Sequence, residues 1–139
     1  MRYILSVVLI LVSLFWSGCS DDAVVIVFDK TITNEKIPCL ALFIPKPDLQ
    51  VEGTLRSLYH FDKDCAWKLE VTKKDSIVCN STQNVQKKAL AHFPSSYLKM
   101  QIKKDDQLKY SYYIDLDESL TQEDVVQGFQ RIKKDLILF

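Results

Sequence analysis

The sequence predicts an α+β fold: a mainly antiparallel sheet of five to seven strands, a C-terminal amphipathic helix and a short helix in the middle of the chain. Two observations predict it. Several apolar stretches alternate with polar residues at the two-residue period of a half-buried strand. Near the C-terminus the period becomes that of a helix buried along one side. The 139 residues, 47% of them hydrophobic, suffice for one core. We therefore expect a single globular domain at residues 23–139.

The first predicted strands come early in this domain. Residues 23–28 form a β-branched apolar run of the kind found in buried strands. Residues 40–44 form a second apolar run. Pro45 ends it, because proline cannot donate to a strand ladder. Residues 55–61 are the next strand candidate.

The middle of the chain contains a clearer strand and the predicted short helix. In residues 66–72 apolar and polar side chains alternate, as in a half-buried strand. The polar residues 73–75 are expected to turn the chain, so that residues 76–79 return. Around residues 83–93 apolar side chains fall four apart, which predicts a short amphipathic helix ending at Pro94.

The last third predicts a hairpin followed by the C-terminal helix. Residues 98–102 and 108–116 alternate across a tight acidic turn. Thr121 then stands three residues before Asp124, which indicates a capping box. One apolar stripe follows at helical spacing, made of Val125, Phe129, Ile132 and Leu136.

The N-terminus has the pattern of an export signal. Arg2 is followed by an uncharged apolar run, residues 4–16, which as a helix would be too short to span a bilayer. The run closes on two small residues, Ser17 and Gly18, followed by Cys19. This pattern resembles the lipobox of bacterial lipoproteins.

The resemblance implies cleavage after Gly18 and fatty acyl chains, such as palmitate, on Cys19. Residues 1–18 would then be a signal peptide and residues 19–22 the lipid attachment and a short tether. Ser20 is not the aspartate that signals inner-membrane retention in many enterobacterial lipoproteins, so the outer membrane is favoured. Which face of the membrane the domain would occupy stays open.

The charge balance excludes some classes of partner. Lysine plus arginine and aspartate plus glutamate each number 18, so the formal net charge is zero. Such a chain has no overall electrostatic attraction to nucleic acid. It is also too apolar to be a disordered tail.

Three further cysteines, Cys39, Cys65 and Cys79, would reach an oxidising compartment, where a disulfide can persist. At most one intramolecular pair can form, and three pairings are possible. A bridge between Cys65 and Cys79 needs a bulge or a bend. A bridge from Cys39 closes a longer loop, which favours Cys39 as a bridged residue. The alternative is three buried thiols.

The remaining polar clusters do not match known site patterns. His60, Asp62 and Asp64 could share one face of a strand, but no second histidine stands nearby and His92 lies in another element. The acidic group of Asp115, Asp117 and Glu118 lacks the spacing of a calcium loop. We therefore expect no metal site, no cofactor and no catalytic residues, and hence no enzyme.

Tyrosines cluster on the C-terminal hairpin. Tyr112 and Tyr113 must point to opposite faces, so one of them is expected at the surface, where tyrosine favours protein interfaces. We name Tyr110, Tyr112 and Tyr113 as interface candidates, with a cross-strand aromatic pair that steadies the sheet as the alternative.

The functional expectation follows from the anchor, the short tether and the lack of recognisable chemistry. It is a membrane-anchored envelope lipoprotein that binds another protein, as an accessory of an envelope or secretion assembly. The alternative is a small-ligand binder or an inhibitor of a cell-wall hydrolase.

Overall fold

The structure, a computed structural model, describes residues 22–77 and 94–138. The elements in chain order are β1 (Val24–Val27), the 3-10 helix η2 (Lys30–Thr33), β2 (Lys36–Ile37), β3 (Ala41–Phe43), α2 (Leu49–Leu58), β4 (Trp67–Lys74), β5 (Ser96–Lys104), β6 (Gln107–Leu116), α4 (Gln122–Asp135) and β7 (Ile137–Leu138).

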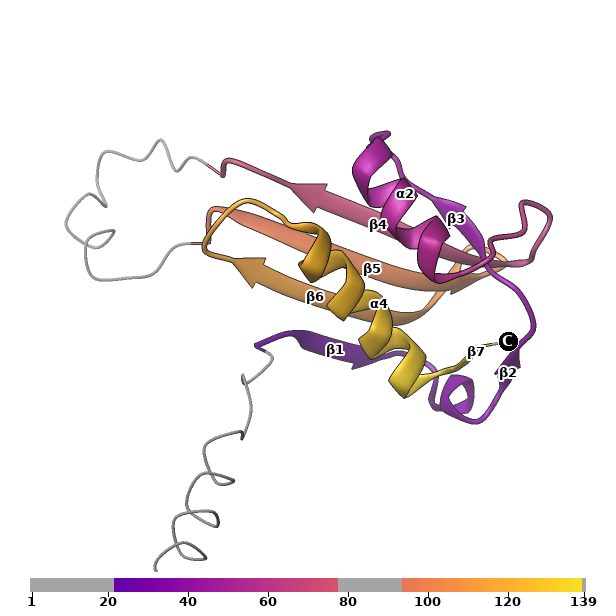
Figure 1. The fold of residues 1–139 in the computed structure, drawn as a ribbon. Coiled ribbons are helices and arrows are strands. Elements are labelled where there is room, and N and C mark those ends of the chain that lie inside the picture. The colour runs from indigo at the N-terminus through magenta and orange to yellow at the C-terminus, as the bar shows by residue number, and fades with distance from the viewer. Residues whose placement is uncertain (1–21, 78–93, 139) are drawn as a thin grey trace, which may run out of the picture.

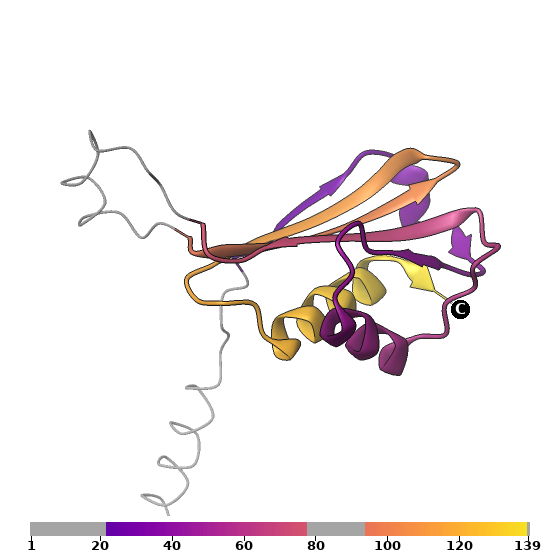
Figure 2. The same cartoon turned by 90° about the horizontal axis from the view of Figure 1, so that it is seen from above.

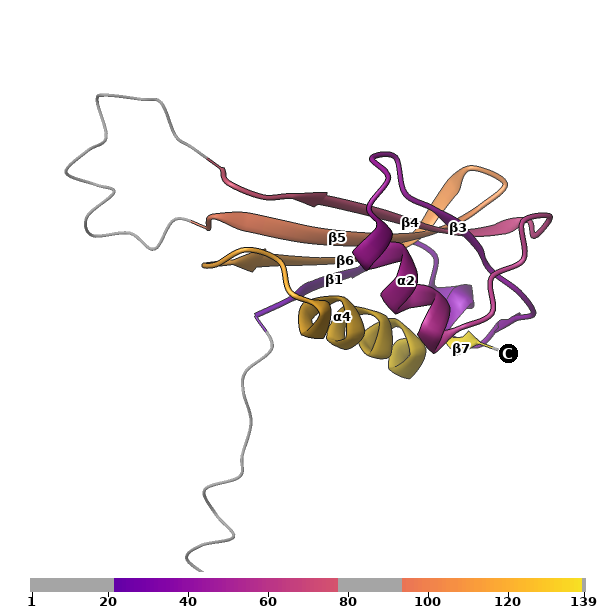
Figure 3. The same ribbon diagram turned by 45° about the horizontal axis from the view of Figure 1, so that its top comes forward.

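Five strands form one sheet in the order β1-β6-β5-β4-β3. All neighbours are antiparallel except β3, which runs parallel to β4. The helices α2 and α4 lie side by side on one face of this sheet (Figure 1), and no described helix covers the other face (Figures 2 and 3). The short strands β2 and β7 pair in parallel in a second, two-stranded sheet. The predicted α+β class, with a mainly antiparallel sheet, is confirmed.

The core lies between the sheet and the two helices. Its largest fully buried side chains come from both layers: Tyr110, Tyr112, Phe129, Ile32, Ile37, Leu40, Leu55, Leu69, Leu98, Met100, Ile102 and Ile132. Because alternate residues of β4, β5 and β6 enter this core, their neighbours are left on the face without helices.

The predicted C-terminal hairpin is confirmed. Strands β5 and β6 pair along their length, with a register shift after Ile102. Asp105 and Asp106 have positive φ angles of 48° and 62°. Aspartate tolerates this left-handed conformation better than most residues, and two such residues in succession suit a tight hairpin turn.

The predicted C-terminal helix is also confirmed. The Thr121 side chain accepts from the Asp124 amide, and the Asp124 side chain accepts from the Thr121 amide, which completes the capping box. All four residues of the predicted stripe, from Val125 to Leu136, are buried.

One predicted strand is wrong. Residues 55–61 form no strand: residues 55–58 are the last turn of helix α2 (Leu49–Leu58), and Tyr59 is its C-cap. Asp48 caps this helix, and Val51 and Leu55, four apart, bury one side of it. This helix lies mid-chain, but it is not the middle helix predicted at residues 83–93, which are outside the described residues.

The predicted turn at residues 73–75 is wrong as well. Strand β4 continues through Lys74 and pairs with β5, with Lys74 opposite Tyr97. Of the predicted returning segment 76–79, Ser76 and Ile77 lie outside any strand, and residues 78 and 79 are outside the described residues.

Strand β1 exists where predicted, but it is not buried. It is an edge strand, and Val24 and Ile26 are exposed. No helix within residues 22–77 and 94–138 is long and apolar enough to cross a membrane.

Candidate binding site on the open side of the sheet

Cys39 and Cys65 form a disulfide with a sequence separation of 26 residues. Cys39 precedes β3 by two residues and Cys65 precedes β4 by two residues. Because β3 and β4 run parallel, their starting ends lie together, which brings the two sulfurs within bonding distance. The expectation that Cys39 is bridged is confirmed, and the alternative of three free thiols is wrong.

Several predicted site residues lie outside the described residues. They are Cys19 with the signal peptide and the start of the tether, the third cysteine Cys79, and His92. The lipid attachment stays a prediction.

The tyrosine cluster is divided between the two faces of the sheet. Tyr110 and Tyr112 are buried in the core, so they do not belong to a surface interface as the sequence suggested. Tyr113 faces the opposite side, half-buried, and its ring stacks on that of Tyr97 with 5.6 Å between centroids. The Tyr113 hydroxyl donates to Asp115 at 2.6 Å, and this bond raises the pKa of Tyr113 to about 12.

The polar clusters carry structural hydrogen bonds. Asp62 accepts from the Asp64 amide in an exposed turn, beside the exposed His60. Within residues 22–77 and 94–138, no three side chains of the types that bind metal ions lie close enough together to hold one.

Two serine hydroxyls donate to backbone carbonyls in the acidic segment before α4. The backbone carbonyls of Asp117 and Glu118 accept from Ser95 and Ser96, respectively. These bonds fasten the segment between β6 and α4 to the start of β5.

The face of the sheet without helices is here called the open face. Its residues, taken from the strand registers, are Val24, Ile26, Phe43, Lys68, Glu70, Thr72, Lys74, Tyr97, Lys99, Gln101, Lys103, Ser111, Tyr113 and Asp115. Apolar side chains stand at both edges: Val24 and Ile26 on β1, and Phe43 on β3, are each about half exposed.

The middle of the open face is polar and carries four lysines against two carboxylates. Lys103 pairs with Glu70 at 2.7 Å, and Lys68 lies 5.8 Å from the centre of the Phe43 ring. The open face thus combines exposed apolar edges, an aromatic stack and an excess of positive charge.

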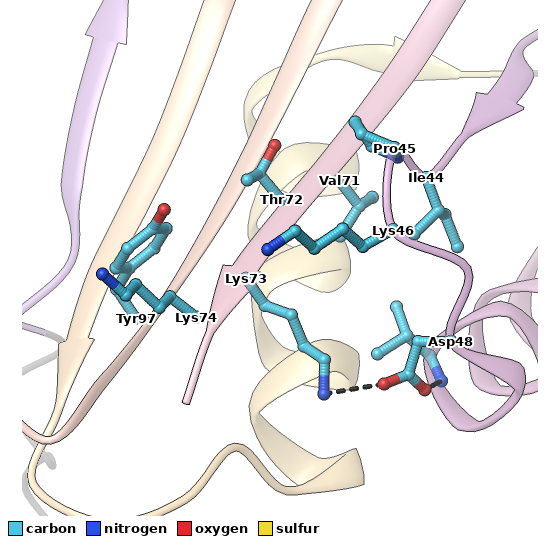
Figure 4. Close-up of a pocket in the computed structure, with 10 residues that line it drawn as sticks. Ile44, Pro45, Lys46, Asp48, Val71, Thr72, Lys73, Lys74 and Tyr97 are labelled. Carbon is cyan, nitrogen blue, oxygen red and sulfur yellow. Dashed lines mark hydrogen bonds and ion pairs between the residues drawn. The ribbon is translucent and has the colours of Figure 1, made fainter. Parts of the chain in front are cut away.

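A cleft of about 210 Å³ lies beside the last half of β4. It is lined by Ile44, Pro45, Lys46, Asp48, Val51, Val71, Thr72, Lys73, Lys74 and Tyr97. Figure 4 shows Lys46 reaching from the segment before α2 towards β4. The Nζ of Lys73 lies 2.7 Å from an Asp48 carboxylate oxygen and 3.0 Å from one of Asp75.

The electrostatics of the cleft follow from these ion pairs. Bonding to Lys73 lowers the pKa of Asp48, and bonding to Asp48 raises the pKa of Lys73. Lys73 is therefore charged and already balanced. Lys46 and Lys74 have no ion pair among the described residues, so they supply the uncompensated positive charge of the cleft.

This cleft was not predicted from the sequence. Its best signal is the segment Pro45-Lys46-Pro47-Asp48, interpreted above only as the end of a strand. Asp48 is a residue type favoured at helix N-caps, and Val51 and Leu55 follow it four residues apart, which also indicates the start of a helix and hence a chain that leaves the sheet.

Comparison of the chain with models of known families, with curated proteins and with solved structures gives no match.

Proposed function

We propose that this protein is an envelope lipoprotein, held to the membrane by acyl chains on Cys19, whose domain binds another protein through the open face of its sheet. The observation that carries the proposal is the open face itself. It leaves Val24, Ile26 and Phe43 exposed at its two edges, and the stacked pair of Tyr97 and Tyr113 lies on the strands between them.

The proposed anchor would hold the open face close to the membrane. Strand β1 begins at Val24, five residues after Cys19, so the tether to the lipid is short. A short tether would hold the apolar β1 edge near the membrane surface, where a partner in the same membrane can reach it. Two or three acyl chains anchor a protein far more firmly than one.

The cleft beside β4 is small for a site that encloses a ligand. It measures about 210 Å³, whereas pockets that enclose small molecules usually measure about 300–1,000 Å³. This cleft therefore does not favour the small-ligand alternative, whereas a partner protein need only lie along its open side.

Two measurements test the proposal. Intact mass of the native product should show a chain that begins at Cys19 and carries acyl chains. Capture of the full chain from detergent-solubilised membranes should return an envelope protein in stoichiometric amount. A bare Cys19 thiol contradicts the anchor. A partnerless monomer that retains a small molecule in native mass spectrometry contradicts the protein-binding role.

A matched pair of variants locates the interface. Ile26→Asp places a charge on the open face, at a side chain that is 48% exposed, and should abolish the capture. Ile137→Asp places the same charge at a 41% exposed isoleucine on β7, in the two-stranded sheet outside the open face, and should leave the capture unchanged. If the captured partner is a cell-wall hydrolase whose activity falls on binding, the inhibitor role is the form that the function takes.

A further inference from the structure

Strand β4 is only partly covered by its neighbour β3. The β3–β4 register ends at Phe43 opposite Glu70, whereas β4 continues to Lys74 and stays paired with β5 on its other side. Residues 71–74 therefore have a strand neighbour on one side only. The cleft of about 210 Å³ lies at this edge.

The backbone of this segment has polar groups directed into the cleft. The Asp105 amide donates to the Ala66 carbonyl at 3.3 Å, and the β4–β5 register, extended by one residue, places these two residues opposite each other. Even-numbered residues of β4 thus direct their amide and carbonyl towards β5, and odd-numbered residues direct theirs the other way. The Lys73 amide and carbonyl accordingly face the side that β3 has left.

A proline explains why the pairing stops. The backbone amide and carbonyl of Phe43 point towards β4. Residue 45, two positions further on, would therefore supply the next backbone amide donor to β4. Residue 45 is proline, which has no N–H. Asp48 then caps the start of α2, which lies on the face of the sheet that α2 and α4 cover, here called the covered face. The position of Pro45 in the sequence therefore leaves this edge of β4 unpaired.

We propose that this edge binds an extended acidic segment of a partner protein, which adds to the sheet as a strand beside residues 71–74 of β4. The proposal rests on the protein-binding function proposed above and names the kind of segment recognised. Addition of a strand to a free sheet edge is a common mode of peptide recognition.

The side chains around the edge define that segment. An added strand would place alternate side chains on the two faces of the sheet. On the covered face it would meet Val51 and Val71, which line the cleft and suit apolar residues, beside the Lys73–Asp48 ion pair, whose charges balance. On the open face it would meet Lys74, with Lys46 at the rim, which suit carboxylates. The expected pattern is therefore an alternation of acidic and apolar residues.

Charge favours an acidic partner segment over residues 78–93 of the same chain as the strand that occupies this edge. Residues 78–93, which join β4 to β5, contain Lys87 and Lys88 and no aspartate or glutamate. Lys46 and Lys74 would repel those lysines and attract the carboxylates of an acidic partner.

The first experiment titrates isotope-labelled full chain in detergent with the blocked hexapeptide TEVEVT. Binding should shift the amide resonances of residues 71–74 and slow hydrogen exchange at the Lys73 amide. The charge-reversed peptide TKVKVT should not bind. TEVEVT methylated on alternate backbone nitrogens, which cannot complete a ladder, should not bind either. Absence of TEVEVT binding at millimolar concentration, or equal binding of the methylated peptide, overturns the proposal.

A pair of double variants tests the lysines. Lys46→Glu with Lys74→Glu should weaken TEVEVT binding by about tenfold or more, because two charge attractions become repulsions. Lys30→Glu with Lys63→Glu makes the same charge change at exposed positions outside the cleft and should leave binding within twofold. Equal weakening by both pairs of substitutions would assign the effect to net charge and would overturn the proposed binding site at the cleft. The amide spectrum of each variant without peptide verifies its fold.

Capture from membranes separates this inference from the proposed function. If the Lys46→Glu, Lys74→Glu chain still captures the partner that wild type captures, the acidic-strand site is wrong and the protein-binding function stands. If TEVEVT binds as described but no partner is captured, the site stands and the proposed function is wrong.

Discussion

The carboxylate of Asp48 joins helix α2 to strand β4. One oxygen accepts from the amides of Gln50 and Val51 at 3.0 and 2.9 Å, and the other lies 2.7 Å from the Nζ of Lys73. The same side chain therefore caps the helix and fixes the distance between the helix start and the strand edge, which frames the cleft.

Substitution of Asp48 should separate these two roles. Asp48→Asn keeps a good helix cap and loses the ion pair, so it should cost about 0.5 kcal/mol of unfolding free energy. Asp48→Ala loses both and should cost about 2 kcal/mol. Urea unfolding followed by tryptophan fluorescence measures both. Equal losses for the two variants would contradict the capping role.

Acid should weaken the fold through the same residue. Because the pKa of Asp48 is lowered in the folded state, its stabilising effect is present above the unfolded value, about 3.8, and is lost as pH falls below it. Wild type should therefore lose more stability between pH 5 and pH 3 than Asp48→Asn does. Parallel pH dependences of the two proteins would contradict this.

The Cys39–Cys65 disulfide should contribute about 3–4 kcal/mol, since it closes a loop of 26 residues in the unfolded chain. The double variant Cys39→Ser, Cys65→Ser should unfold at correspondingly lower urea concentration. Dithiothreitol should lower the stability of wild type to that of the double variant and should leave the double variant unchanged. A reductant effect on the double variant would place the sensitive bond elsewhere.

The sequence predicted those elements whose signals are local. The alternation in β5 and β6 and the capping box of Thr121 are complete within a few neighbouring residues, and both were located correctly. The sequence does not predict helix α2 because its buried side is short, with only Val51 and Leu55 of this helix fully buried, and because Pro45 and Pro47 indicate only the end of the preceding strand.

The disulfide partner and the cleft depend on pairing between distant segments. Cys39 meets Cys65 only because β3 lies parallel to β4, which no local pattern encodes. The cleft likewise depends on where β3 stops beside β4. Alternation places Tyr112 and Tyr113 on opposite faces of β6, but it does not say which face the helices cover, so it leaves Tyr110 and Tyr112 as interface candidates although they are buried.

Gly128 is required by the close approach of α4 to the sheet. A Cβ added there would stand 2.9 Å from a ring carbon of Tyr112 and 3.3 Å from Met100. Gly128→Ala should therefore cost about 1 kcal/mol, since overpacking exceeds the gain in helix propensity.

The other helical glycine is the control. Gly53 in α2 is exposed, and a Cβ added there would have no neighbouring atom within 4 Å, so Gly53→Ala should stabilise by about 0.5–1 kcal/mol. Thermal unfolding of both variants gives the comparison. Stabilisation of both to the same extent would contradict tight packing at Gly128.

The buried hydroxyl of Tyr110 donates to Asp135 at 2.8 Å, and Asp135 also pairs with Arg131 at 3.0 Å. Tyr110→Phe removes a hydrogen bond to a charged acceptor that keeps one other partner, so it should cost about 1–2 kcal/mol at pH 7. Chemical unfolding of the two proteins measures this difference.

Alkali should reduce the difference between Tyr110→Phe and wild type. Burial, together with the bond to Asp135, raises the pKa of Tyr110 well above its ordinary value of 10.0. The stabilisation is therefore complete below pH 10 and decreases above it, by up to about 1.4 kcal/mol per pH unit. Between pH 9 and pH 11 wild type should lose more stability than Tyr110→Phe, and equal losses would show that the Tyr110 hydroxyl does not hold its proton through burial.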